Sequence, residues 1–110
     1  MSSPLAGAWV LVSDTHEGVG VMTERYFNIT WAEKDRKPFK QDENPSQAEA
    51  AEAYRSFSSA AGRYELSGNV ATLHRMVNRN PSWHGQAVKW EYRLEGDHLT
   101  FGPNLWKRVE

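Results

Sequence analysis

Short runs of alternating polarity, separated by turn-forming residues, constrain the fold of this chain more than any other feature. The clearest run, AVKWEYRL at residues 87–94, has charged residues on one side of an extended chain and, on the other, Val88, Trp90, Tyr92 and Leu94. Sequences typical of turns recur at short intervals, at residues 17–20, 67–69, 79–82, 95–97 and 102–104. This spacing is typical of antiparallel strands joined by hairpins, so the sequence predicts a mainly β fold.

One segment lacks this alternation and predicts an α-helix. The alanine-rich sequence SQAEAAEAYRSFSSAAG carries apolar residues at helical spacing, at Ala50, Ala53, Tyr54, Phe57 and Ala61. Ser46 and Glu49 form a capping-box pattern at its start, and Gly62 suits a left-handed cap at its end. We therefore expect one helix near residues 46–61, preceded by a charged surface connector at 32–45.

Length and composition exclude several classes of function. The chain of 110 residues has room for one domain, which we place at residues 1–110. Its 13 basic and 14 acidic residues give a formal net charge of -1, which predicts no nucleic-acid partner. The absence of cysteine rules out disulfides and zinc–thiolate sites and agrees with a reducing compartment, so we expect a cytoplasmic protein.

The sequence also offers no motif for a membrane, a metal ion or a cofactor. The N-terminal residues MSSPLAGAWVLVSD have no basic segment before a short apolar run, so we expect neither a signal peptide nor a membrane span. His74 and His84 flank the turn at 79–82, but a hairpin there places His84 opposite Met76. No three ligands converge in this pattern, so we expect no metal and no cofactor.

The N-terminal residues Gly7, Ala8 and Trp9 raise the question of why a large ring lies so near a chain end. Trp9 could be ordinary core. In small barrels of the lipocalin and fatty-acid-binding kind, however, a Gly-x-Trp ring closes one end and packs against a basic side chain of the last strand. This chain ends in NLWKRVE, and the resemblance implies Lys107 or Arg108 as that partner.

A longer set of residues resembles the lipocalin-like domain family of bacteria and fungi. In order along residues 48–101, the matching positions are Gly62, Arg63, Tyr64, His74, Pro81, Trp83, Gly85, Gly96 and Asp97. The resemblance implies a calycin-type antiparallel β-barrel. The family's usual extra strand and turn are missing between Ser13 and Val21, so we expect about six to eight strands. The helix, the connector or the second subunit of a homodimer would then cover a gap in the barrel.

Strand parity predicts which side chains line the interior. In NVATLHRMVN, residues 69–78, we place His74 and Met76 inside and Arg75 outside. The candidate ligand-binding residues are Tyr26, Asn28, Tyr64, His74, Met76, His84, Val88, Trp90 and Tyr92. His74 and Tyr64 are the candidate catalytic residues, because an enclosed histidine can transfer a proton near neutral pH. A histidine that is merely hydrogen-bonded to a neighbour is the alternative.

These residues are compatible with three kinds of function. The first is binding of a small apolar or aromatic molecule inside the barrel. The second is a cofactor-independent isomerase, cyclase or lyase that uses His74 as general acid or base. The third is a solid domain that acts through its surface. We favour binding, because no constellation of residues demands catalysis.

Overall fold

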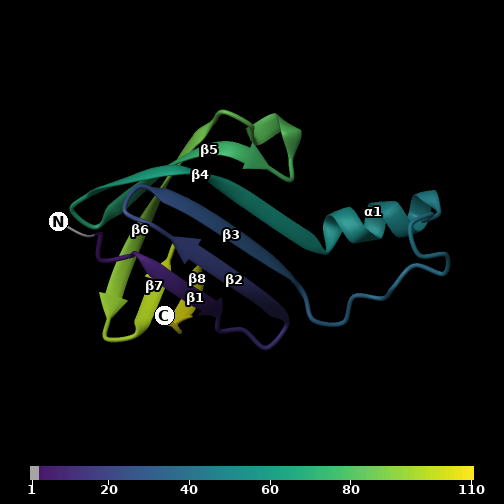
Figure 1. The fold of residues 1–110 in the computed structure, drawn as a ribbon, viewed down its shortest axis with the longest axis horizontal. Coiled ribbons are helices and arrows are strands. Elements are labelled where there is room, and N and C mark those ends of the chain that lie inside the picture. The colour runs from purple at the N-terminus through teal and green to yellow at the C-terminus, as the bar shows by residue number, and fades with distance from the viewer. Residues whose placement is uncertain (1–2) are drawn as a thin grey trace.

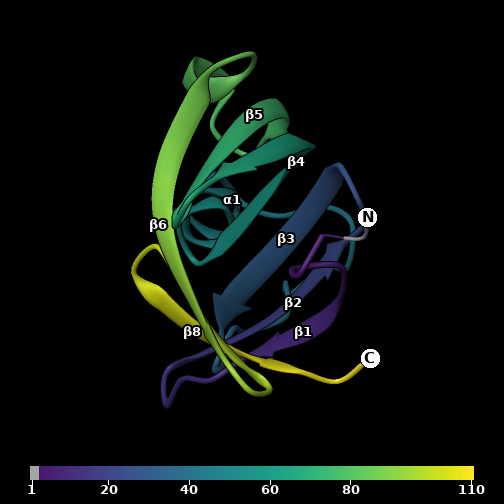
Figure 2. The ribbon, with the colours of Figure 1, turned by 90° about the vertical axis from the view of Figure 1, so that its left-hand side faces the viewer.

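The computed structural model describes residues 3–110, which form a closed barrel of eight antiparallel strands (Figure 1). The strands are β1 (Gly7–Leu11), β2 (His16–Met22), β3 (Tyr26–Glu33), β4 (Phe57–Ser67), β5 (Val70–Asn78), β6 (Ala87–Glu95), β7 (His98–Phe101) and β8 (Asn104–Arg108). Each pairs with its neighbours in sequence, and β1 also pairs with β8, which closes the barrel. Figure 2 shows the strands arranged around the interior. The predicted mainly β barrel is confirmed.

The N-terminal half supplies a strand where a turn was predicted. The sequence EGVG at residues 17–20 lies inside β2, which pairs with β3 along its length and with β1 from Val19 to Met22. A β-carbon on Gly18 would lie 2.9 Å from the carbonyl oxygen of Thr30, so this glycine permits a close approach between strands. The expected gap in the barrel is therefore wrong, and neither the helix, the connector nor a second subunit is needed to fill it.

The predicted helix begins where expected and ends early. Helix α1 (Gln47–Arg55) has the full capping box, in which Ser46 and Glu49 exchange hydrogen bonds of 2.9 and 3.2 Å. Residues 57–61 belong instead to β4, where they pair with β3. Pairing with a neighbouring strand outweighs the helix propensity of serine and alanine here. Gly62 is not a helix cap but lies at a bulge between β4 and β5.

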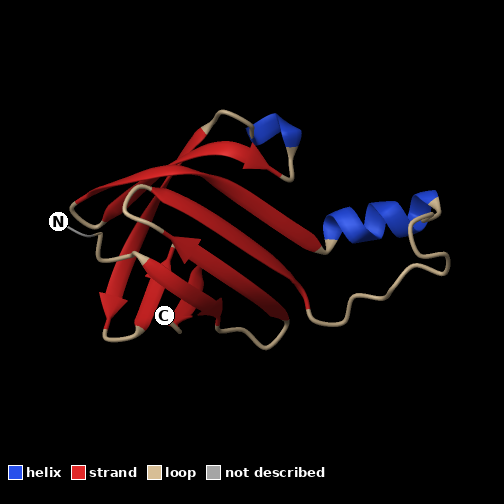
Figure 3. Ribbon diagram, in the orientation of Figure 1, coloured by secondary structure: helices blue, strands red, loops and turns tan. Residues whose placement is uncertain are grey.

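Helix α1 and the connector at 34–46 form an arm that projects from the barrel beyond the ends of β3 and β4 (Figure 3). The molecule measures 48 Å along its longest axis and 29 and 20 Å along the others. No residue of α1 is buried, so the apolar stripe predicted for this helix does not pack into a core. Within residues 3–110, no helix has the length and apolar character needed to cross a membrane.

The prediction that Trp9 packs against a basic side chain of the last strand is confirmed. Its side chain is 1% exposed, and its indole N–H donates to the carbonyl of Leu5 at 3.0 Å. The guanidinium carbon of Arg108 lies 4.3 Å from the centre of the Trp9 ring, a cation–π contact worth about 0.5 to 2 kcal/mol. Arg108 also donates to the carbonyls of Ala6 and Pro4, at 2.6 and 2.8 Å. The partner of Trp9 is therefore Arg108, while Lys107 is exposed.

Candidate functional site

A cavity of about 160 Å³ lies inside the barrel, between β3, β4, β5 and β6. Most of its wall is apolar and comes from Phe27, Ile29, Trp31, Leu73, Val88 and Trp90. These residues point inward because they alternate along their strands with exposed or half-buried positions. Trp90 is held in place by the edge of the Phe101 ring, with ring centres 5.2 Å apart.

Small side chains on β4 leave the space that forms this cavity. Along the ladder between β3 and β4, Ile29 is paired with Ala60 and Trp31 with Ser58. Large side chains of β3 therefore face a strand that has little volume at the paired positions. The hollow follows from this pairing, since a barrel this small is otherwise filled by its own side chains.

The polar side chains of the cavity are Ser58, Arg75 and Asn78. The Nε–H of Arg75 donates to the carbonyl of Gln86 at 3.0 Å, and the guanidinium lies 5.2 Å from the centre of the Trp83 ring. Trp83 belongs to the short 3₁₀ helix η1 (Pro81–Trp83) and is 44% exposed. Because Trp83 both lines the cavity and meets solvent, the cavity reaches the surface beside Arg75.

A β-bulge explains why Arg75 and Asn78 face the same cavity although they are three residues apart. Gly62 pairs with Arg75 and Ala60 with Asn78, with the register shift between Ala61 and Gly62. Leu73 and Ala71 are the buried residues of β5, so the interior parity expected for this strand is wrong up to the bulge. Parity reasoning missed Arg75 because apolar residues stand on both faces of β5, and the face that carries Ala71 and Leu73 is the buried one.

His74 consequently lies on the outer face of the barrel, not in the interior. Its Nε2 is 2.7 Å from Oε1 of Glu65, and its side chain is 34% exposed. This hydrogen bond, together with the nearby imidazole charge, lowers the pKa of the Glu65 carboxyl. The structure thus places His74 outside the cavity lining and in a hydrogen bond with a neighbour, which is the arrangement of the alternative interpretation.

The remaining predicted site residues divide into three groups. Val88 and Trp90 line the cavity. Tyr64 and Tyr92 point inward but lie outside that lining: the Tyr64 hydroxyl donates to the carbonyl of Thr23 at 2.6 Å, and Tyr92 donates to that of Gly68 at 2.9 Å. Burial raises the pKa of the Tyr64 phenol, which keeps it a neutral donor.

The third group faces away from the interior. Its members are Tyr26, Asn28, Met76 and His84. In β3 the buried set is Phe27 and Ile29, so the inward orientation expected for the alternate residues is wrong. Met76 follows the inward-facing Arg75 and is exposed, as its place in the alternation of β5 requires. His84 lies in the loop after η1, where its Nε2 is 2.9 Å from the carbonyl of Asn78.

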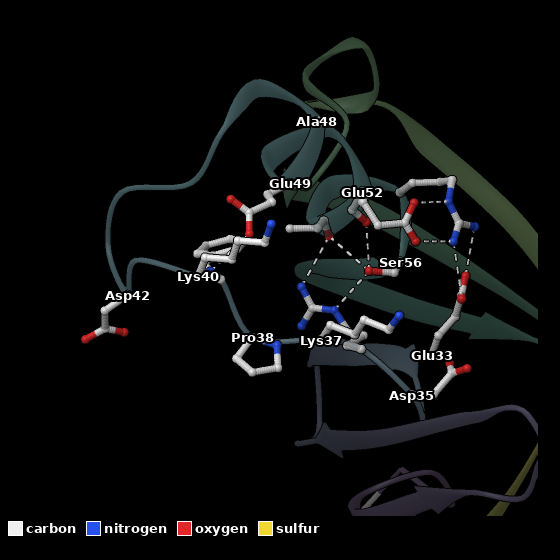
Figure 4. Close-up of a pocket in the computed structure, with 14 residues that line it drawn as sticks. Glu33, Asp35, Lys37, Pro38, Lys40, Asp42, Ala48, Glu49, Glu52 and Ser56 are labelled. Atoms are coloured by element: carbon white, nitrogen blue, oxygen red, sulfur yellow. Dashed lines mark hydrogen bonds and ion pairs between the residues drawn. The ribbon is translucent and has the colours of Figure 1, made fainter.

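A larger hollow of about 1080 Å³ lies on the arm, between the connector and α1 (Figure 4). Charged side chains of both signs line most of it. Arg55 bridges the carboxylates of Glu33 and Glu52 at 2.9 and 2.5 Å, and Arg36 donates to the Ser56 hydroxyl at 3.0 Å. Because these groups already satisfy one another at the surface, the cavity inside the barrel is the better candidate site.

Comparison with known proteins supplies one match. The model of a family described as "Lipocalin-like domain" matches residues 13–109, which extends the resemblance from residues 48–101 to nearly the whole chain. Neither the curated proteins nor the solved structures provide a match to this chain. The residues 3–110 contain no group of three or more histidine, aspartate or glutamate side chains arranged to hold a metal ion.

Proposed function

Because the chain belongs to the lipocalin-like domain family, we propose that it binds a small apolar or aromatic molecule inside its barrel. The observation that carries this proposal is the barrel cavity, whose wall is mainly aliphatic and aromatic and which opens beside Trp83. A hollow interior with a mainly apolar wall and a few polar side chains is typical of small-molecule sites.

The volume limits the size of the ligand. An apolar cavity of about 150 Å³ in a protein core accepts one benzene molecule, so a cavity of about 160 Å³ suits a single ring or a short branched chain. A ligand of this size buries little area, and we expect a dissociation constant in about the micromolar to millimolar range.

The composition supports the remaining parts of this proposal. A formal net charge of -1 favours a small molecule over nucleic acid as partner, and the lack of cysteine supports a cytoplasmic location. A homodimer stays a prediction. The barrel closes without a partner, so no gap in the sheet requires a second subunit. Sedimentation of the purified protein over a range of concentrations tests that point.

A titration with toluene tests the proposed function. Trp31 and Trp90 both line the cavity, so their indole N–H resonances should shift in NMR spectra as the ring enters. Ala60→Leu should abolish the shifts, because Ala60 faces the cavity and the added carbons fill it. Ala61→Leu is the matched control, since Ala61 is the adjacent residue on the opposite face of β4.

Two results would contradict binding inside the barrel. The first is the absence of saturable shifts of these indole resonances in the unsubstituted protein. The second is an equal loss of binding in both leucine variants, which would place the ligand elsewhere or indicate general damage to β4. Urea unfolding of both variants shows whether each is folded.

A further inference from the structure

We propose that the ligand of the barrel cavity carries a carboxylate, which Arg75 binds at the cavity opening. The proposal rests on the proposed function, because it names the chemical class of the molecule that enters the same cavity. In this arrangement the ring or branched chain of the acid occupies the apolar part between β3 and β6. A small aromatic monocarboxylic acid of about the size of benzoate is the class that fits both parts.

The first argument is that Arg75 is oriented but has no anionic partner. Its Nε–H donates to the carbonyl of Gln86, and its guanidinium carbon lies 5.2 Å from the centre of the Trp83 ring. Among residues 3–110, no carboxylate lies within ion-pair distance of Arg75, and neither terminal nitrogen of its guanidinium donates a hydrogen bond. A guanidinium fixed through Nε presents its terminal N–H groups as a fork, which matches the two oxygens of a carboxylate.

The second argument comes from the other polar groups of the cavity. Oδ1 of Asn78 accepts the backbone N–H of Asn80 at 2.8 Å, which leaves the Nδ2 amide as a donor without a partner in the described chain. The hydroxyl of Ser58 likewise has no hydrogen bond to residues 3–110 and lines the same cavity. No aspartate or glutamate lines it. Donors from three side chains that line one small cavity, with no acidic side chain among the lining residues, favour an anionic group over a cationic one.

The third argument is the position of the charge relative to the apolar wall. Arg75 lies beside Trp83, where the cavity reaches solvent, and Phe27 and Trp90 line the same cavity from β3 and β6. A carboxylate at the opening keeps part of its hydration, while a ring attached to it is removed from water. A charge placed among the apolar residues would lose that hydration without a compensating partner.

The test compares three ligands of similar shape, toluene, benzamide and benzoate, by NMR titration of the indole N–H resonances at neutral pH and low salt. A charge-assisted pair at a partly open site should make benzoate bind at least about tenfold more tightly than benzamide. Arg75→Gln should bring the ratio of the benzoate affinity to the benzamide affinity close to one, and this ratio is the readout for the variant. Added salt should weaken the binding of benzoate only.

Two further variants separate recognition of the anion from support of the fold. Arg75→Lys keeps the charge but loses the fork, so its affinity for benzoate should lie between those of the unsubstituted protein and Arg75→Gln. Arg63→Gln removes an exposed arginine from the outer face of β4 and should leave the preference for benzoate unchanged.

The outcomes that would overturn the proposal differ from those that would overturn ligand binding itself. If toluene binds saturably but benzoate is not preferred over benzamide, the proposal of ligand binding in the cavity is retained and the carboxylate proposal is refuted. An equal loss of toluene and benzoate binding in Arg75→Gln would show that Arg75 has a structural role beside Trp83, and this result also refutes the carboxylate proposal. Failure of all three molecules to shift the indole resonances refutes both proposals.

Discussion

Gly62 faces the carbonyl oxygen of His74 so closely across the β4–β5 ladder that a β-carbon at position 62 would overlap that oxygen. The close approach occurs at the bulge that sets the register of the two strands, and this register directs Arg75 and Asn78 into the barrel. One glycine thus links the geometry of the sheet to the composition of the candidate site. A side chain at this position requires the two backbones to separate.

Gly62→Ala should therefore lower the free energy of unfolding by at least about 2 kcal/mol, because backbone atoms cannot yield as a flexible side chain does. Urea denaturation followed by tryptophan fluorescence measures the change. Gly20→Ala is the control, since a β-carbon on this buried glycine meets ordinary contacts of 3.7 Å and should be tolerated. Equal destabilisation by both variants would contradict the close approach at Gly62.

The cap over Trp9 provides a second prediction. Arg108→Ala removes the cation–π contact and two hydrogen bonds to the carbonyls of Ala6 and Pro4, so it should cost about 1 to 3 kcal/mol of unfolding free energy. Lys107→Ala should cost no more than about 0.5 kcal/mol, because this neighbouring cation is exposed. Thermal unfolding of both variants measures the difference. The assigned partner of Trp9 is wrong if Lys107→Ala proves the more costly change.

The arm should unfold independently of the barrel. Ser46→Ala breaks the capping box of α1 and should weaken that helix by about 1 kcal/mol. The midpoint of global unfolding should stay unchanged, because no residue of α1 is buried. Hydrogen exchange should then be faster for amides of residues 47–55 and unaltered for those of β3 and β4. A lower global midpoint would show that the arm supports the barrel.

The orientation of a strand could be predicted from the sequence where its two faces differ clearly in polarity. In β6 one face is charged and the other apolar, and the predicted inward set from Val88 to Leu94 packs on the core. In β5 both faces carry apolar residues, and the direction of His74 was predicted wrongly. The bulge lies beyond His74, at Met76, and it arises from the pairing of two strands, so no pattern within β5 alone predicts that Asn78 faces inward.

The same limit applies to the end of the helix and to the first half of the barrel. Apolar residues at 57–61 continue the helical spacing, yet these residues form a strand because they pair with β3, which is distant in the sequence. Gly18 and Gly20 are typical of a turn when only their neighbours in sequence are considered. In the structure both lie within β2, where Gly18 is close to Trp31 and Gly20 to Trp106. The contact between Trp9 and Arg108 could be predicted because the resemblance to small barrels implies a basic partner in the last strand.

The pair formed by His74 and Glu65 should make stability depend on pH. The pKa of the Glu65 carboxyl is lower in the folded protein than its ordinary value, so its contribution is present above that value and lost as the pH falls through the folded pKa. His74→Ala should flatten the dependence of stability on pH in the acidic range, below the ordinary pKa of a glutamate. It should also bind toluene normally, because His74 lies outside the cavity.

An NMR titration of the Glu65 side chain checks this directly. Its pKa should rise toward that of an ordinary glutamate in His74→Ala, since the hydrogen bond to the imidazole is the largest cause of the shift. Glu91→Gln, on the outer face of β6, is a control for a general change in surface charge and should leave Glu65 unaffected. An unchanged titration of Glu65 without His74 would contradict the pairing.

The empty volume of the barrel predicts opposite effects of one substitution on stability and on binding. Ala60→Leu adds three carbons that face a cavity of about 160 Å³, and their burial should raise the free energy of unfolding by about 1 to 2 kcal/mol. Ala61→Leu on the outer face should change it by less than about 0.5 kcal/mol. Urea denaturation gives both values. If Ala60→Leu is more stable and no longer binds toluene, misfolding cannot explain the loss of binding. A destabilised variant would instead show that the cavity is too narrow for the added side chain, and therefore too small for a ring.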